Sequence, residues 1–278
     1  MLSRKCGRCY RSFQKLCYGR WRPTPKGIVP ILDIPWQDII NLDLAIAAAV
    51  AVAAAVIRGL TGFGANLLWG PVLVILYGPA ETVAIMGLTG AMSVSPIFIP
   101  SMRHVNWREI WTIVLAAFIF APLGVWTLLH LDPSAFKKAM GGFILVMACV
   151  LMSGWNYKGE RGVAAQLVTG GVSGWLAGFA GIGGPTCVLY FMAAPGPAVV
   201  QRANNTISVA MLIPPPLIVL ALNGHIGVAT LIKAVCMVAP YMFGQWLGSL
   251  LFGKLPDQTF RTVVLWLLVA IGIGIMLF

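Results

Sequence analysis

Apolar residues run along most of this chain in long stretches, separated by short polar or proline-rich connections. The stretches do not alternate apolar and polar residues, so they predict helices rather than the strands of a membrane β-barrel. Several approach or exceed the roughly 20 residues that a helix needs to cross a bilayer. The predicted segments cover approximately residues 42–57, 64–77, 82–101, 110–130, 139–155, 163–178, 182–195, 203–223, 228–252 and 262–278. We therefore predict an all-α polytopic membrane protein with about 8–10 membrane segments.

The first apolar stretch, residues 42–77, is too long for one crossing. As a single helix it would measure about 54 Å, whereas the hydrocarbon core of a bilayer is about 30 Å thick. Glycines lie in its middle, and glycine permits the backbone dihedrals that break a helix. We predict that the stretch folds back, either as a re-entrant hairpin or as two spans.

The second half of the chain repeats landmarks of the first half in the same order. The matched pairs are Gly62-Phe63 with Gly178-Phe179, Gly70-Pro71 with Gly184-Pro185, His104-Val105 with His225-Ile226, Ala121-Pro122 with Ala239-Pro240, and Trp126 with Trp246. We divide the chain into an N-terminal tail (1–40), a first transmembrane repeat (41–157) and a second (158–278), each repeat starting with a Gly/Pro-broken helical hairpin. A fold-back contributes an even number of crossings, and three segments follow it, so the two halves are predicted to be inverted repeats. The inversion fails if the broken stretch crosses once.

The composition supports a membrane protein and isolates the tail. Hydrophobic residues make up 59% of the chain and charged residues 10%, against about 25% charged residues in an average soluble domain. These values argue against an ordinary soluble enzyme and against extensive disorder. The net charge is +11, and residues 1–27 carry eight basic residues and no acidic one. We interpret this basic tail as a cytoplasmic arm near anionic lipid, with an organelle transit peptide as the alternative.

Two further interpretations of the tail are disfavoured. It carries no motif of a nucleic-acid-binding surface. Cys6 and Cys9, with Cys17 nearby, lack the second ligand pair of a structural zinc site, so free or palmitoylated thiols are the better interpretation. We predict no metal and no cofactor.

The two glycine-rich motifs carry the candidate chemistry. The first runs from Arg58 to Pro71 and the second from Gly170 to Pro185. A helix that starts inside the membrane presents unpaired N–H groups and the positive end of its dipole, which attract an anion. Two such starts, one in each half, would face one anion. The alternative is close packing of helices through small residues, and the spacing of Gly170, Gly174 and Gly178 fits that role. A dinucleotide-binding loop does not fit, because no strand precedes either motif.

These motifs resemble those of the sulfite exporter TauE/SafE family of membrane transporters. The resemblance covers nearly all of residues 42–278 and rests on the residues 59–71 of the first motif and 178–185 of the second, followed by Val188-Leu189-Tyr190 and Arg202-Ala203. The first motif departs from the glycine-richest form of the family at Ala65-Asn66-Leu67. The resemblance implies transport of small sulfur-containing anions such as sulfite or sulfonates.

The candidate substrate-binding residues combine the motifs with polar groups inside apolar segments. Ionisable side chains within a membrane cost about 2.5–3.5 kcal/mol on insertion scales, so they are functional candidates by default. Arg202 and Lys233 have the alternative of reaching a membrane interface with a long side chain. His104 and His225 lie in connections and are interpreted as surface histidines. The candidates are Arg58, Thr61, Gly62, Gly64, Asn66, Gly181, Gly183, Gly184, Arg202, Asn205 and Lys233.

The predicted function is a secondary transporter, with export as the direction, in a bacterial inner membrane. Its substrate would be sulfite or an organosulfonate, bound near the bilayer midplane at the two helix breaks. A membrane scaffold or assembly factor and an anion channel are the alternatives. An intramembrane enzyme is disfavoured, because no nucleophile-and-base or metal-ligand pattern is present. The predicted partners are the small anion and the lipid bilayer, without nucleic acid, and association into homo-oligomers is left open.

Overall fold

A computed structural model describes residues 41–61, 64–94, 98–99, 101–153, 162–192, 197–251, 266, 269–270 and 272–275. The basic tail, the motif residues Gly62 and Phe63, and most of the last predicted segment lie outside these residues. The described part of the chain contains helices and no strand. It has six apolar spans long enough to cross a membrane, of which five are single helices and one, Val199–Leu222, covers two. The predicted all-α polytopic class is confirmed. The number of membrane segments and the internal repeat stay predictions.

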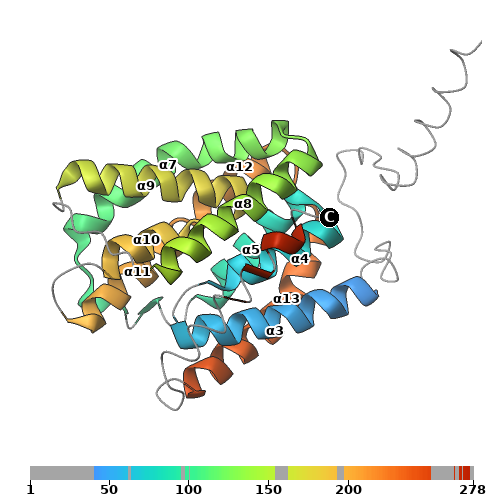
Figure 1. The fold of residues 1–278 in the computed structure, drawn as a ribbon, viewed down its shortest axis with the longest axis horizontal. Coiled ribbons are helices and arrows are strands. Elements are labelled where there is room, and N and C mark those ends of the chain that lie inside the picture. The colour runs from blue at the N-terminus through green and yellow to red at the C-terminus, as the bar shows by residue number, and fades with distance from the viewer. Residues whose placement is uncertain are drawn as a thin grey trace, which may run out of the picture. The chain divides into compact units, whose positions relative to one another are not determined.

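The helices follow the predicted apolar segments closely (Figure 1). The described helices are α3 (Leu42–Thr61), α4 (Ala65–Tyr77), α5 (Pro79–Ser93), the 3-10 turn η2 (Met102–His104), α7 (Trp107–His130), α8 (Pro133–Met152), α9 (Val163–Ala180), α10 (Gly184–Met192), α11 (Ala198–Met211), α12 (Pro214–Leu222) and α13 (Val228–Leu251). The segment predicted at 203–223 divides into α11 and α12, because Pro214, Pro215 and Pro216 start a new helix there.

Each glycine-rich motif separates a long helix from a short one. The long helices α3 and α9 have 20 and 18 residues, whereas α4 has 13 and α10 has 9. At 1.5 Å per residue α4 is about 20 Å long, which is too short for a straight crossing of a core about 30 Å thick. The apolar stretch 42–77 is therefore interrupted, as predicted, and its second part has the length of a re-entrant helix.

Long helices of the two predicted repeats pack in parallel pairs, α3 along α13 and α7 along α9 (Figure 1). Gly244 faces Val52 and Gly248 faces Val56, so α3 and α13 advance in the same direction. In the other pair, Gly170 faces Ile113 and Gly174 faces Ala117. Small residues let the helix backbones approach closely, as is common in membranes.

Two polar contacts mark opposite ends of the helices around α5. Leu217 packs on Gly87 and Ile213 on Gly90, so α12 is antiparallel to α5 and ends beside its start. The next helix, α13, begins at that end, where Lys233 meets Glu81. Because α11 precedes α12, the start of α11 lies at the other end, where Asn204 meets Asn106 at the start of α7. We call these two ends the Glu81 end and the Asn106 end.

Candidate functional site

Both helix breaks contain a glycine in the left-handed region of the backbone map. Gly64 has a φ of 92° and is the N-cap of α4, and Gly181 has a φ of 70° and ends α9. The Gly181 N–H donates to the Ala177 carbonyl four residues back, which is the αL motif of a helix end. The Ile182 N–H donates to the Leu176 carbonyl. An L side chain would be strained at either glycine. The two breaks are thus fixed turns of the backbone.

The two breaks border one cavity of about 80 Å³. Helix α3 contributes its last turns, α4 and α10 their first residues, α9 its end, and α5, α11 and α12 apolar side chains. The predicted candidates Arg58, Gly64, Asn66, Gly181, Gly183 and Gly184 all line the cavity, together with Ala65, Leu67, Val83, Met86, Gly87, Gly90, Ala177, Ile182, Pro185, Val209, Leu212, Ile213, Pro216 and Leu217. Among these lining residues Arg58 is the sole charged one, so the cavity has a net positive charge.

Arg58 is held in place from the opposite half of the chain. Its Nη1 donates a hydrogen bond of 2.8 Å to the Tyr241 hydroxyl, and its guanidinium lies 5.9 Å from the centre of the Tyr241 ring. Tyr241 is 1% exposed and packs on Trp69, with ring centres 5.5 Å apart. The indole N–H of Trp69 donates in turn to the Ala47 carbonyl at 3.2 Å. This chain of contacts orients the guanidinium without neutralising it.

Asn66 connects the two breaks directly. Its Nδ2 donates a 2.7 Å hydrogen bond to the carbonyl of Gly181, across 115 residues of sequence. The bond joins the first turn of α4 to the end of α9. The first turns of α4 and α10 therefore both border this cavity. In the first turn of a helix, N–H groups have no carbonyl of the same helix to which they can donate a hydrogen bond.

The second break depends on glycine for close packing. A Cβ on Gly183 would lie 2.5 Å from the Ser173 carbonyl and 2.8 Å from Leu212 Cδ2. Behind it, the Ser173 and Thr186 hydroxyls are hydrogen-bonded to each other, and Thr186 Oγ1 also donates to the Gly183 carbonyl at 3.1 Å. Proline behaves differently in the two halves. Pro185 lies in the first turn of α10, whereas Pro71 lies inside α4 and not at its start.

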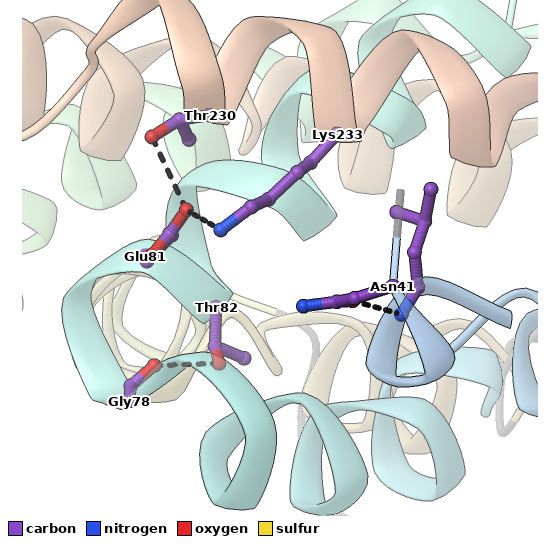
Figure 2. Close-up of polar contacts among 7 residues, drawn as sticks. Asn41, Gly78, Glu81, Thr82, Thr230 and Lys233 are labelled. Atoms are coloured by element: carbon purple, nitrogen blue, oxygen red, sulfur yellow. Dashed lines mark hydrogen bonds and ion pairs between the residues drawn. The ribbon is translucent and has the colours of Figure 1, made fainter. Parts of the chain in front are cut away.

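Lys233 does not line this cavity (Figure 2). Its Nζ forms a 2.9 Å ion pair with Glu81 Oε1 and lies 4.3 Å from the centre of the Tyr77 ring. The Thr230 hydroxyl is 3.5 Å from the same carboxylate oxygen. Lys233 lies about one and a half turns into α13, close to Glu81 at the start of α5. It therefore pairs with the Glu81 carboxylate and does not line the cavity.

The remaining candidates are placed as follows. Arg202 is exposed on α11, away from the cavity. Asn205 is 9% exposed on the same helix but is not among the cavity-lining residues. Thr61 is the last residue of α3, and Gly62 lies outside the described residues. Gly170, Gly174 and Gly178 take the packing role, because a Cβ on Gly174 would come within 2.5 Å of the Ala117 Cα on α7.

Sequence reasoning missed Tyr241, Met86 and the Pro216-Leu217 pair. Tyr241 follows Pro240, one of the landmarks of the predicted internal repeat. A lone tyrosine in an apolar run was a usable signal for a polar contact. Met86, Pro216 and Leu217 are apolar residues on membrane helices. Nothing in the sequence distinguishes them from lipid-facing neighbours, because their position depends on how α5 and α12 pack.

Taken together, the fold and the cavity define a multi-pass membrane protein with two broken helices around one positively charged site. The family model described as "Sulfite exporter TauE/SafE" matches residues 47–275, so the chain belongs to the sulfite exporter TauE/SafE family. Membership implies membrane transport of sulfite-like anions, and this is a family of transporters rather than enzymes. Comparisons with curated proteins and with solved structures gave no match.

Proposed function

We propose that this protein carries sulfite or a small organosulfonate across a bacterial inner membrane, as an exporter, and binds the anion in the cavity between the two helix breaks. The observation that carries the proposal is that one cation and two helix starts, one from each predicted repeat, line the same small cavity. The scaffold alternative lacks a comparable observation, because a scaffold needs no such site.

The charge of the cavity suits a dianion. The start of a helix carries roughly half a positive charge, so α4 and α10 together with the Arg58 guanidinium present about two positive charges. No carboxylate lines the described cavity. The guanidinium offers several N–H donors in a fixed fork, which matches the oxygens of an oxyanion. Glycine at positions 181, 183 and 184 keeps side chains away from the backbone donors.

The size and the depth of the cavity also suit a small anion. A cavity needs about 10–15 Å³ for one water molecule, so about 80 Å³ leaves room for an ion of four heavy atoms. Val209, Leu212 and Pro216 fall near the middle of the 24-residue span Val199–Leu222. This depth supports a site near the bilayer midplane, where broken-helix transporters bind their substrates.

The test is uptake of radiolabelled sulfite into proteoliposomes that contain the purified full-length protein. Methanesulfonate, sulfate and chloride serve as competitors, and the assay is run with and without a pH gradient. We expect saturable sulfite uptake that methanesulfonate reduces. Absence of uptake of every anion, from protein shown to be folded, would contradict transport.

Arg58→Ala tests the site itself. A hydrogen bond to a charged group contributes about 1.5–3 kcal/mol, so we expect uptake to fall about 10- to 100-fold. Lys138→Ala, which removes an exposed cation of α8 outside the cavity, is the matched control and is expected to leave uptake unchanged. Equal uptake by Arg58→Ala and the native protein would show that the anion binds elsewhere.

A further inference from the structure

Helix α11 buries polar side chains along one face. Gln201, Asn204, Asn205 and Ser208 recur at helical spacing, and Leu212, which lines the cavity, continues the same face. At 100° per residue these five positions fall within about 100° of the helix circumference. Asn204 is 3% exposed, Asn205 9% and Ser208 0%. In a membrane protein an inward polar face is costly and usually lines a functional pathway.

Two polar atoms on this face have no hydrogen-bond partner among the described residues. They are the Asn205 Oδ1 and the Ser208 Oγ, and both are buried. Polar side chains that join membrane helices do so by bonding across the interface. Asn204 fits that role, because its Oδ1 accepts the Asn106 N–H at 2.8 Å. The Asn205 Oδ1 and the Ser208 Oγ make no such bond among the described residues, so interhelical bonding does not account for these two atoms.

The polar face begins at the cavity and continues to one end of the helices. From Leu212 back to Gln201 the helix rises about 16 Å, which is half of a hydrocarbon core about 30 Å thick. The face thus extends from the middle of the Val199–Leu222 span to the Asn106 end. A water molecule or an oxyanion that passes along it would satisfy the two unpaired atoms.

We propose that the buried polar face of α11 is the route by which the anion, with part of its water, moves between the cavity and the Asn106 end, and that Asn205 and Ser208 bind it on the way. The inference rests on the proposed function, since it takes the cavity as the anion site. It names the end of the helices to which the cavity connects, and two residues that contact the anion on the way.

The first test is chemical accessibility, which does not depend on sulfite transport. Asn205→Cys and Ser208→Cys are made in the full-length protein, reconstituted in oriented vesicles and exposed to a charged, membrane-impermeant thiol reagent from each side separately. Mass spectrometry reads each cysteine by its peptide. Cys187, which is fully buried in an apolar cluster on the neighbouring helix α10, is the internal control.

We expect both new cysteines to react from the Asn106 end at least about tenfold faster than Cys187, because a thiol reacts as the hydrated thiolate. Reaction no faster than that of Cys187 would overturn the inference, and so would reaction from the Glu81 end alone. Labelling together with an absence of sulfite uptake would leave the route standing and contradict the proposed substrate.

The second test measures flux in variants of similar size. Asn205→Leu removes the polar group, and we expect sulfite uptake to fall about tenfold, the loss of one hydrogen-bonding site. Thr206→Val is the control on the same helix, because the Thr206 hydroxyl bonds to the Arg202 carbonyl of its own helix. Equal uptake by Asn205→Leu and Thr206→Val, in protein that folds, would contradict a role for Asn205 in the route.

Discussion

Helices α5 and α11 border the same cavity, one from each predicted repeat, yet their buried polar groups differ in how many are hydrogen-bonded. On α5 the Thr82 hydroxyl donates to the Gly78 carbonyl at 2.7 Å, Thr89 to Ala234 at 3.3 Å, and Ser93 to Gly90 at 3.3 Å. Figure 2 shows the Thr82 bond beside the Glu81–Lys233 ion pair. On α11 the Asn205 Oδ1 and the Ser208 Oγ are buried without a partner.

The difference separates polar residues that hold the fold from polar residues that are left available. An unsatisfied buried polar group costs about 1–3 kcal/mol. Proteins retain such local inconsistencies mainly at functional sites. The partner of a buried polar residue is therefore a better guide to its role than its type or its depth in the membrane. By this criterion we propose a structural role for Lys233 and a functional role for Ser208, although Lys233 is the more prominent residue in the sequence.

The largest effect on stability and on sulfite uptake is expected at Gly183, in the second helix break. Gly183→Ala would place a methyl group 2.5 Å from the Ser173 carbonyl and 2.8 Å from Leu212 on α11. We expect an unfolding free energy lower by about 1–3 kcal/mol, as in other overpacked sites, and loss of sulfite uptake. Thermal unfolding in detergent and uptake in proteoliposomes measure the two quantities.

Gly184→Ala is the matched control for this prediction. The added Cβ would lie 3.6 Å from Val209, an ordinary contact. It should therefore change stability little. If Gly184→Ala lowers the unfolding free energy as much as Gly183→Ala does, the close approach of Gly183 to Leu212 is not what limits the size of this residue.

A smaller effect is expected at the Glu81 end. Lys233→Met leaves the half-buried Glu81 carboxylate without its cation, so we expect the unfolding free energy to fall by about 1–2 kcal/mol, between the values for exposed and buried pairs. The charge-exchanged double variant Glu81→Lys/Lys233→Glu should recover most of this loss. Loss of sulfite binding with unchanged stability in Lys233→Met would place this lysine in the anion site and contradict its structural role.

The smallest and most discriminating effect concerns single hydroxyls on the two helices. Ser208→Ala removes an unpaired hydroxyl, so stability should stay equal or rise by up to about 1 kcal/mol. Thr89→Val removes a bonded hydroxyl on α5 and should lower stability by about 0.5–1.5 kcal/mol. Equal shifts of stability in the same direction would contradict the difference between the bonded hydroxyl of Thr89 and the unpaired hydroxyl of Ser208.

The sequence was sufficient to predict the helical class, most helix positions and the two breaks, because apolar length and glycine placement are local properties. It also led to Arg58, Gly64, Asn66 and the glycines of the second break, which line the cavity. It did not predict the pairing of Lys233 with Glu81. That contact joins residues 152 positions apart and depends on how α5 packs on α13.

The inverted repeat stays a prediction, and the helix packing supports it. The parallel pairs join the first helix of one predicted repeat to a later helix of the other, α3 with α13 and α9 with α7. A two-fold relation between the halves would produce this exchange. The sequence alone did not indicate which helices pair, because small residues suit many partners.

Binding of one anion between the two helix breaks can be tested directly by an experimental structure of the full-length protein with sulfite, compared with one without it. We expect density for a single anion within hydrogen-bonding distance of the Arg58 guanidinium and the first turns of α4 and α10. An anion bound elsewhere, such as beside Lys233, with the cavity holding water alone, would contradict it.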